Sequence, residues 1–295
     1  MKIGITGATG LIGKRIVALA CERGHQTVGF SRDPKHGVAG CVETRRFSLD
    51  EKPDVNGLDA IIHLAGENVF GLWTREKKRR IRDSRVAGTR HMVEAIRASK
   101  VPPRVLVSGS AIGFYGDTGE NIADENAPPG EGFLAEVTRA WEAEARGVSA
   151  AGVRLVLLRT SIVLSKNGGA LATMRPAFKL GLGGKIGNGR QWMSWIHLDD
   201  EAALALFAVE NETLHGPLNA AAPEPVRNAD FTRALARALH RPAILAVPAF
   251  VLKMAAGEFS RELLDSKRVI PKVAVENGFS FRFPQLNDAL RDLAV

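Results

Sequence analysis

Short apolar segments alternate with longer amphipathic segments over the first part of the chain. Apolar side chains dominate residues 2–6, 25–30, 59–66, 104–108 and 153–159, and a weaker segment of this kind spans 43–48. Such runs predict strands that are buried on both faces, as in a parallel sheet. Helices are predicted at 11–23, 74–98, 133–147 and 198–211. The alternation predicts an α/β fold with a doubly wound parallel sheet.

The pattern changes after about residue 165. Two glycine-rich stretches, around 168–169 and 181–189, surround a short predicted helix at 170–180. A separate C-terminal piece begins near residues 241–242 and ends in a predicted helix at 285–293. We therefore expect a Rossmann-type domain made of residues 1–164, which also uses about 196–222. A smaller, interleaved C-terminal substrate lobe would be made of 165–195 and 223–295.

The first strand runs directly into the glycine-rich stretch Thr6-Gly7-Ala8-Thr9-Gly10-Leu11-Ile12-Gly13. A strand, a glycine turn and a helix start form the layout of a dinucleotide phosphate site. Gly7 allows the tight turn, Gly10 lets the backbone approach a pyrophosphate, and Gly13 lets the helix pack on the strand. The helix N-terminus adds unpaired N–H groups and a partial positive charge.

The residues after the second strand indicate which dinucleotide is bound. An acidic residue here holds the ribose 2′-OH of NAD, whereas a basic residue suits a 2′-phosphate. Ser31 takes the acidic position and Arg32 follows it. A hydroxyl and a guanidinium are suitable phosphate donors, which favours NADP(H). The alternative is an ordinary turn in which Arg32 pairs with Asp33.

Composition narrows the class of protein. With 45% hydrophobic and 24% charged residues the chain has the make-up of a soluble globular protein. No apolar run approaches the roughly 18 to 20 residues that cross a bilayer, and no targeting peptide is visible. Cys21 and Cys41 are the only cysteines, and Cys21 is expected to be buried on the first helix, so no disulfide framework is predicted. We expect a cytoplasmic protein with no membrane partner and no metal site.

The chain is basic, with a net charge of +8 and a pI of about 9.8. Its densest basic run spans residues 75–82, and we interpret this run as a solvated helix face. Aromatic residues do not interleave with it and no nucleic-acid motif accompanies it, which argues against a nucleic-acid partner. His63 lies within an apolar predicted strand, and we interpret it as a core histidine.

Together these features resemble the extended short-chain dehydrogenase/reductase superfamily. The resemblance rests on Thr6-Gly7-x-x-Gly10-x-x-Gly13, His63-Leu64-Ala65-Gly66, Val86-x-Gly88-Thr89, Ser110-Ala111 before Tyr115-Gly116, and Gly187-Asn188-Gly189-x-Gln191 before Trp195-Ile196-His197-Leu198-Asp199-Asp200. The chain more narrowly resembles the atypical "epimerase family" branch, NAD(P)-dependent epimerase/dehydratase-like with a C-terminal extension. The marks of this branch are Ala65-Gly66-Glu67-Asn68, Trp141-Glu142, residues 158–164 and residues 179–184.

The resemblance implies a cofactor site along one edge of the sheet. Its residues would be Gly7, Thr9, Gly10, Leu11, Ile12, Gly13, Ser31, Arg32, Leu64, Ala65, Gly66, Glu67, Arg85, Ser108, Arg159 and Ile162. The cofactor would be NADP(H), and the substrate an unknown small molecule. In relatives the helices matching 74–98 and 133–147 pair across dimers, so the resemblance is compatible with a monomer or a homodimer.

The superfamily's catalytic pair, Tyr-x-x-x-Lys, is missing from its expected helix. Phe133 stands at the tyrosine position and Val137 at the lysine position. Tyr115 is the only tyrosine of the chain, and Gly119 follows it four residues later. Of the residues that usually form the superfamily's catalytic site, only a serine remains in this sequence. By alignment it is Ser110, and Ser108 is the alternative.

Two further positions depart from the superfamily. Arg85 replaces the usual asparagine, where it would bind cofactor phosphate or ribose, bind an anionic substrate, or form a structural salt bridge. Met193 and Ser194 precede Trp195 where sugar-nucleotide epimerases carry an arginine for the substrate diphosphate. Arg190 is the nearest substitute. The missing arginine weighs against a sugar-nucleotide epimerase or dehydratase.

Two functions follow from these residues. The first is an NADP(H)-dependent oxidoreductase acting on a small carbonyl or alcohol, with Ser110 and Tyr115 as candidate proton-transfer groups. The alternative for Tyr115 is a packed loop aromatic. The second function is a non-catalytic NADP(H)-binding regulator or sensor, because loss of the pair is expected where binding is kept and turnover is abandoned. The resemblance also implies a link to cell division for such a regulator, because some relatives carry labels for cell-division roles.

Overall fold

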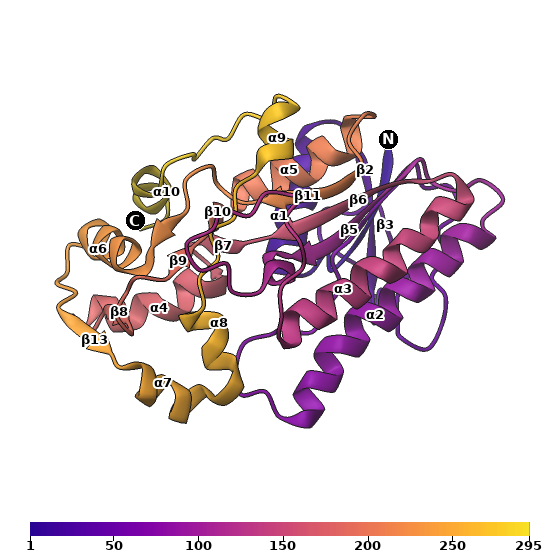
Figure 1. Cartoon of the computed structure of the whole chain (residues 1–295). Coiled ribbons are helices and arrows are strands. Elements are labelled where there is room, and N and C mark those ends of the chain that lie inside the picture. The colour runs from indigo at the N-terminus through magenta and orange to yellow at the C-terminus, as the bar shows by residue number, and fades with distance from the viewer. Residues whose placement is uncertain (295) are drawn as a thin grey trace.

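A seven-stranded sheet forms the centre of the computed structural model, which describes residues 1–294 (Figure 1). Its order is β11-β6-β5-β4-β1-β2-β3, and all neighbours pair in parallel. The strands, in chain order, are β1 (Lys2–Thr6), β2 (Gln26–Ser31), β3 (Glu43–Arg46), β4 (Ala60–His63), β5 (Val105–Ala111), β6 (Arg154–Thr160) and β11 (Gly216–Ala220). The predicted α/β fold with a doubly wound parallel sheet is confirmed.

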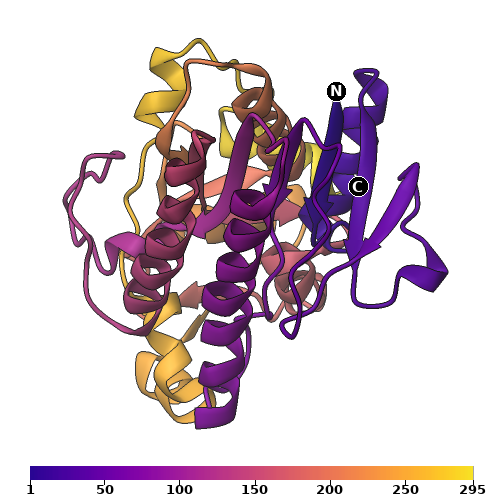
Figure 2. The ribbon, with the colours of Figure 1, turned by 90° about the vertical axis from the view of Figure 1, so that its right-hand side faces the viewer.

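Helices cover both faces of this sheet because the strands are apolar on both sides. On one face lie α1 (Leu11–Glu22) and α5 (Leu198–Glu210), which share a core with the sheet and with each other. On the other face lie α2 (Arg75–Ala98) and α3 (Phe133–Arg146), side by side in Figure 2. Thr74 fixes the start of α2 by accepting a hydrogen bond from the Lys77 amide at 3.1 Å.

The remaining elements gather beside the carboxyl edge of the sheet, at the left of Figure 1. Three two-stranded sheets pair β7 (Ile162–Ser165) with β10 (Trp195–His197), β8 (Gly184–Ile186) with β13 (Leu245–Val247), and β9 (Trp192–Met193) with β12 (Val226–Arg227). The helices here are α4 (Gly169–Lys179), α6 (Asn228–Ala238), α7 (Ala249–Ala256), α8 (Ser260–Leu264) and α10 (Leu286–Ala294). Helix α9 (Lys272–Glu276) instead packs against β11, at the top of Figure 1. Trp195 and Phe231 belong to a separate apolar core of this region.

Several sequence expectations are corrected in detail. Cys21 is exposed rather than buried, because the buried stripe of α1 passes through Ile16, Val17 and Ala20 and leaves the next residue facing out. The strand expected at 59–66 ends at His63, and the strand expected to end at 108 continues to Ala111. Trp192 and Trp195, which follow the second glycine-rich stretch, begin β9 and β10. The far end of the proposed lobe, residue 295, lies outside the described residues.

Within residues 1–294, no helix combines the length and apolarity that crossing a bilayer would need. Across the same residues, no three His, Cys, Asp or Glu side chains gather in a way that would hold a metal ion.

Candidate functional site

The loop between β1 and α1 leaves its amide groups open. Gly7 has a φ of 69°, which lets the chain turn beneath the helix. Gly10 caps α1 without any side-chain hydrogen bond, so the first-turn amides point out of the helix end. A Cβ on Gly13 would lie 2.2 Å from the Gly7 carbonyl oxygen, so only glycine permits this close packing. The loop therefore has a geometry in which backbone amides can face an anion.

Thr6 connects this loop to the end of β4. Its Oγ1 accepts hydrogen bonds from the amides of Leu64 and Ala65 at 2.9 and 3.0 Å. The same oxygen lies 2.8 Å from Nδ1 of His63, whose Nε2 lies 3.1 Å from Thr89 Oγ1. Burial lowers the pKa of His63 to about 4, so its ring is neutral at physiological pH. His63 is therefore a core histidine, as the sequence indicated.

The carboxyl ends of β2 and β3 form the basic side of the site. Ser31 closes a turn, in which its Oγ accepts from the Asp33 amide at 3.1 Å. The Asp33 carboxylate accepts from the Lys35 amide and lies 2.8 Å from His36 Nδ1, while Arg32 is exposed. The Asp33 carboxylate is thus engaged elsewhere, and the alternative of an Arg32–Asp33 pair gains no support.

Arg46 is a basic residue at this edge that the sequence analysis missed. It ends β3 in register with Ser31 and is exposed. Its guanidinium pairs with Glu51. The signal for it was the Arg45-Arg46 pair at the end of the weakest predicted strand, next to the second strand in a parallel sheet.

Arg85 reaches from α2 to the loop after β4. Its Nη1 donates to the carbonyl oxygens of Glu67 and Ile81 at 2.9 and 3.1 Å. A Cβ on Gly66 would lie 3.1 Å from the Arg85 Cζ, so the guanidinium lies against this loop. Burial lowers the pKa of Arg85 to about 10, which leaves it charged at neutral pH. The Arg85 guanidinium thus donates to backbone carbonyl groups, and the carboxylate of nearby Glu67 pairs with Lys77 at 2.8 Å instead.

The candidate catalytic residues belong to one buried network. Ser110, Arg159 and Asn219 are register partners on β5, β6 and β11. Arg159 donates twice to Glu142 of α3, from Nε at 2.8 Å and from Nη2 at 2.9 Å. Ser110 Oγ donates to the same carboxylate at 2.7 Å. Both Arg159 and Glu142 are only 2% exposed, so this ion pair is fully inside the protein.

Tyr115 completes the network from the short helical turn after β5 (Ile112–Tyr115). Its hydroxyl accepts from Arg159 Nη1 at 2.8 Å and donates to Asn219 Oδ1 at 2.7 Å. Burial raises the pKa of Tyr115 to about 12, although Arg159 opposes that shift. The phenol is therefore protonated at neutral pH. Ser108, the alternative serine, is completely buried and donates to the Gly109 carbonyl at 3.3 Å.

Phe133 and Val137, which the sequence places at the positions of the catalytic pair, lie in apolar surroundings. The Phe133 ring, at the start of α3, lies 4.9 Å from the Trp73 ring, edge to face. Trp73 in turn contacts Phe259 of the C-terminal region, and Phe259 contacts Phe70. Val137 is buried. This aromatic wall was missed because its members are distant in sequence and follow no motif.

The other cofactor candidates lie around these groups. Thr9 is exposed beside Gly10, whereas Leu11 and Ile12 are partly buried at the start of α1. Leu11 contacts the loop before α4, because a Cβ on Gly168 would lie 3.1 Å from its side chain. Ile162 begins β7 just after the end of β6. The structure therefore gathers the candidates at the carboxyl edge, where ligands of such sheets bind.

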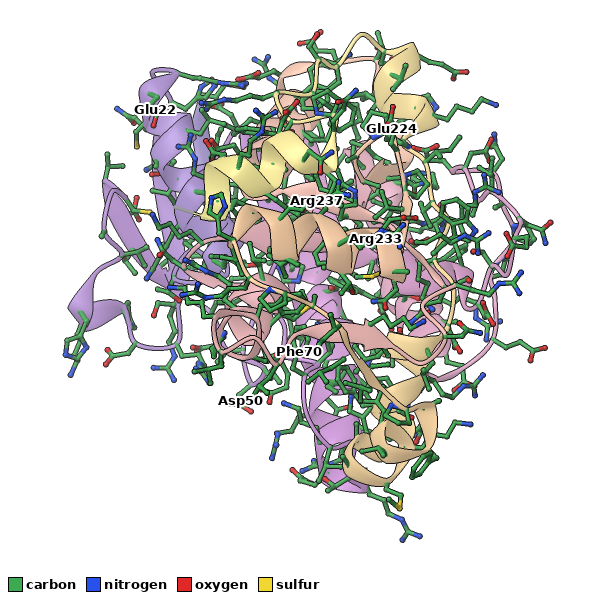
Figure 3. All side chains as sticks on the ribbon, turned by 90° about the vertical axis from the view of Figure 1, so that its left-hand side faces the viewer. Glu22, Asp50, Phe70, Glu224, Arg233 and Arg237 are labelled. Carbon is green, nitrogen blue, oxygen red and sulfur yellow. The ribbon has the colours of Figure 1, made fainter. Side chains whose placement is uncertain are left out.

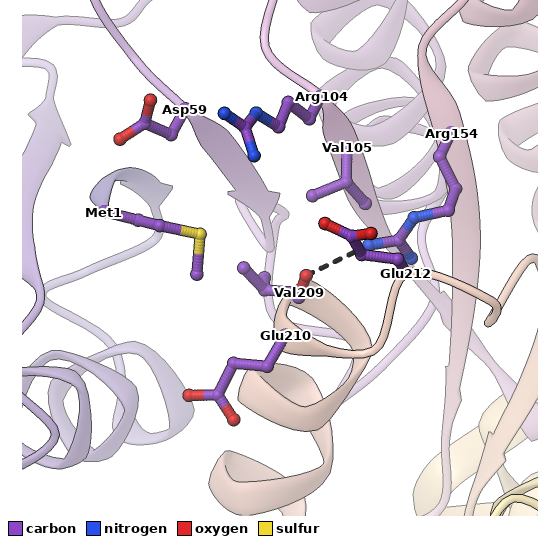
Figure 4. Close-up of a pocket in the computed structure, with 8 residues that line it drawn as sticks. All are labelled: Met1, Asp59, Arg104, Val105, Arg154, Val209, Glu210 and Glu212. Atoms are coloured by element: carbon purple, nitrogen blue, oxygen red, sulfur yellow. Dashed lines mark hydrogen bonds between the residues drawn. The ribbon is translucent and has the colours of Figure 1, made fainter.

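A cavity of about 270 Å³ lies at the opposite edge of the sheet (Figure 4). It opens beside Met1, Asp59 and Arg104, at the amino ends of β1, β4 and β5. Arg154, in its wall, donates to the carbonyl oxygens of Ala208, Val209 and Leu214, so its hydrogen bonds join α5 to the sheet. This cavity is remote from the glycine loop and is not part of the candidate site.

Comparisons with known proteins decide the family. The model of the NAD dependent epimerase/dehydratase family matches residues 3–221. The chain belongs to this family. A second model, a domain of unknown function (DUF1731), matches residues 247–293, which accounts for the C-terminal extension of this family member.

Two relatives and one solved structure match this family member over nearly its whole length. It is 38% identical to the epimerase family protein ML0860 of Mycobacterium leprae, over 98% of this chain and 94% of that protein. It is 36% identical to the epimerase family protein YfhF of Bacillus subtilis, over 99% of this chain and 98% of that protein. A crystal structure of human epimerase family protein SDR39U1 (isoform 2) with NADPH matches with a TM-score of 0.92 and 32% identity, over 100% and 99% of the two chains. The resemblance to the epimerase family branch is confirmed.

Proposed function

We propose that this protein is an NADP(H)-binding oxidoreductase that reduces a small carbonyl compound. The observation that carries the cofactor assignment is the open glycine loop beside the free basic end of β2. The diphosphate would lie on the first-turn amides of α1, and Ser31 and Arg32 would hold the 2′-phosphate. Arg46 supplies a second cation in register with Ser31. The human relative crystallised with NADPH supports the same choice.

The residues present fit such a group. Gly7, Gly10 and Gly13 keep the loop compact, because a Cβ on them would lie 3.2, 3.1 and 2.2 Å from protein atoms, and Gly66 lets the Arg85 guanidinium lie against the loop after β4. Arg85 holds the loop after β4 through the Glu67 carbonyl, so its proposed role is to position that loop along the cofactor. When bound, NADPH supplies a hydride. The chain itself must then orient the substrate and supply a proton.

The protonation of the buried network favours reduction over oxidation. Oxidation of an alcohol needs a base, which in the superfamily is a tyrosinate, whereas Tyr115 has a pKa raised to about 12. Reduction of a carbonyl needs an acid, and both Tyr115 and Ser110 carry a proton. To donate to the substrate oxygen, Tyr115 must break its hydrogen bond to Asn219, and Ser110 must break its hydrogen bond to Glu142.

A non-catalytic NADP(H) sensor is the second candidate. Tyr115 and Ser110 are both 4% exposed and donate within the protein, which favours a static role. A sugar-nucleotide substrate gains no support, because Ser194, at the position of the missing arginine, is buried and donates to the Lys267 carbonyl at 2.7 Å.

Turnover separates the two candidates. Purified protein with NADPH is followed by nicotinamide absorbance against a broad panel of aldehydes and ketones. Oxidation that is lost in both Tyr115→Phe and Ser110→Ala, with NADPH affinity unchanged, supports the reductase. Tight NADPH binding without turnover on any carbonyl identifies the sensor instead.

The cofactor assignment has its own test. Arg32→Ala removes a charge-assisted phosphate contact, and we expect about a tenfold loss of NADPH affinity or more. NADH affinity should hardly change, because NADH has no 2′-phosphate. Fluorescence titration with both cofactors measures the difference, and Arg23→Ala, a change to another arginine that pairs with Glu210 instead, is the control. Equal losses for NADPH and NADH would rule out the proposed contact.

A further inference from the structure

One side of the C-terminal region exposes an apolar surface that the proposed function does not use. Its members come from the loop after α4, from β13 and from α7: Leu180, Leu182, Ile244, Leu245, Val247, Phe250, Val251 and Met254. Ile244 is 86% exposed and Met254 77%. Neither β13 nor α7 contains a buried residue. We call these eight residues the α7 face.

The two chain segments of the α7 face lie side by side. Strand β13 pairs with β8 in parallel, with Leu245 opposite Gly184 and Val247 opposite Ile186. Arg241 Nε donates to the Lys179 carbonyl at 3.0 Å, which joins the two segments just before the exposed leucines. A soluble protein seldom leaves so many neighbouring large apolar side chains in water, so the surface indicates a binding site.

The two chain segments that carry the α7 face are rich in cations. Residues 166–198 and 231–257 contain no Asp or Glu. Their charged residues are Lys166, Arg175, Lys179, Lys185, Arg190, Arg233, Arg237, Arg241 and Lys253. The acids that border these segments, Asp199, Asp230 and Glu258, pair with Arg15, Arg233 and Lys78. Figure 3 looks onto this side, with Arg233 and Arg237 labelled on α6.

We propose that the α7 face docks on the surface of a bilayer that contains anionic phospholipid. The apolar side chains would enter the boundary between headgroups and acyl chains, and the surrounding lysines and arginines would contact lipid phosphates. The sequence expectation of no membrane partner rested on the lack of a spanning segment, and a peripheral contact needs none.

Two other occupants fit the surface less well. A second copy of the chain would bring two predominantly cationic surfaces together, and like charges at an interface are costly. An apolar peptide needs an apolar groove, whereas four of the six residues that line the pocket beside α7 are polar or charged: Lys253, Ser260, Arg261 and Asp265, with Gly257 and Leu264. Its cations Lys253 and Arg261 suit a headgroup phosphate, although Asp265 lies 3.9 Å from Arg261. A bilayer, by contrast, needs no matching groove, because its fluid acyl chains accept protruding apolar side chains of any shape.

Flotation of the full chain with vesicles tests this inference. One vesicle contains phosphatidylcholine alone, and the other contains equal parts of phosphatidylcholine and phosphatidylglycerol. We expect binding to the second, weaker at high salt because the lipid contact is partly electrostatic. Phe250→Ser with Met254→Ser removes two exposed apolar anchors and should lower binding by about tenfold or more. Lys179→Gln with Lys185→Gln should lower it similarly.

Matched controls change equivalent residues elsewhere. Val101→Ser alters an apolar residue that is 74% exposed, and Arg79→Gln with Arg82→Gln alters the basic helix α2. These variants should bind like the unchanged protein, and NADPH titration shows that every variant is folded. Failure of the unchanged protein to float, or equal binding by all variants, would overturn the inference. So would a dimer in sedimentation that Phe250→Ser with Met254→Ser converts to a monomer.

Discussion

The residues around Arg159 show how a few buried polar groups define this site. Arg159, Glu142 and Ser110 satisfy one another inside the protein, where an unpaired charge would be very costly. The strong pair also fixes the helix α3 against β6, because one partner comes from each. The same network therefore contributes both to stability and to the placement of Tyr115.

Removing one partner of this ion pair should be far more damaging than removing a surface pair. We expect Glu142→Ala to lower the free energy of unfolding by about 3 to 5 kcal/mol, because Arg159 is left buried and unpaired. Glu144, two residues along the same helix, pairs with Arg90 at the surface, and Glu144→Ala should cost about 1 kcal/mol or less. Urea unfolding of both variants measures the difference, and similar losses would contradict the buried assignment.

At the scale of elements, the junction of β1 with α1 was the most predictable part of the site. Its shape depends on glycines close together in sequence, so a local motif was enough to find it. The network around Tyr115 was not predictable in this way. Ser110, Arg159 and Asn219 lie far apart in sequence, and only the register of β5, β6 and β11 places them together.

Substitution by alanine should have opposite effects at two helical glycines of this family member: it should be harmful at one and favourable at the other. A Cβ on Gly13 would meet the Gly7 carbonyl oxygen at 2.2 Å, so Gly13→Ala must displace the loop. We expect about a tenfold loss of NADPH affinity or more, as phosphate contacts are misaligned. A Cβ on Gly88 of α2 meets only Leu49 and Phe47 at 3.4 Å or more, so Gly88→Ala should gain up to about 1 kcal/mol of stability. NADPH titration and thermal unfolding test both, and unchanged affinity in Gly13→Ala would contradict the close packing.

For the whole molecule, the fold class and the course of the main helices followed from the alternation of apolar segments. The α7 face did not, because an apolar stretch such as 243–256 is expected in a core until the structure shows that no part of residues 1–294 covers it. The division into a Rossmann domain and a smaller lobe stays a proposal. Contacts of Ala274 and Phe279 with the main core show that the C-terminal segment packs against the sheet domain.

The stability of the whole protein should depend on pH through two buried groups with opposite effects. Burial raises the pKa of Glu201 from 4.5 to about 8, so the folded state keeps a proton that the unfolded state releases. Stability from this residue is therefore lost as pH rises from about 4.5 to 8. Burial lowers the pKa of His63 from 6.5 to about 4, so stability is lost as pH falls through that range.

Two variants isolate these effects. Glu201→Gln keeps an acceptor for the Thr160 hydroxyl and should become more stable relative to the unchanged protein as pH rises, by a few kcal/mol in total. His63→Gln should become more stable relative to the unchanged protein as pH falls below 6.5. Urea unfolding across this range measures both. Differences that do not vary with pH would contradict the shifted pKa values.

The single tyrosine of the chain also makes the buried network visible to optical spectroscopy. Tyr115 is the only source of a phenolate absorption band, so an ultraviolet titration reports on one known hydroxyl without any label. Its midpoint should lie near 12 in the resting protein. If a substrate draws this hydroxyl away from Asn219, the midpoint will move, and the unmodified protein will itself record whether the network opens during turnover.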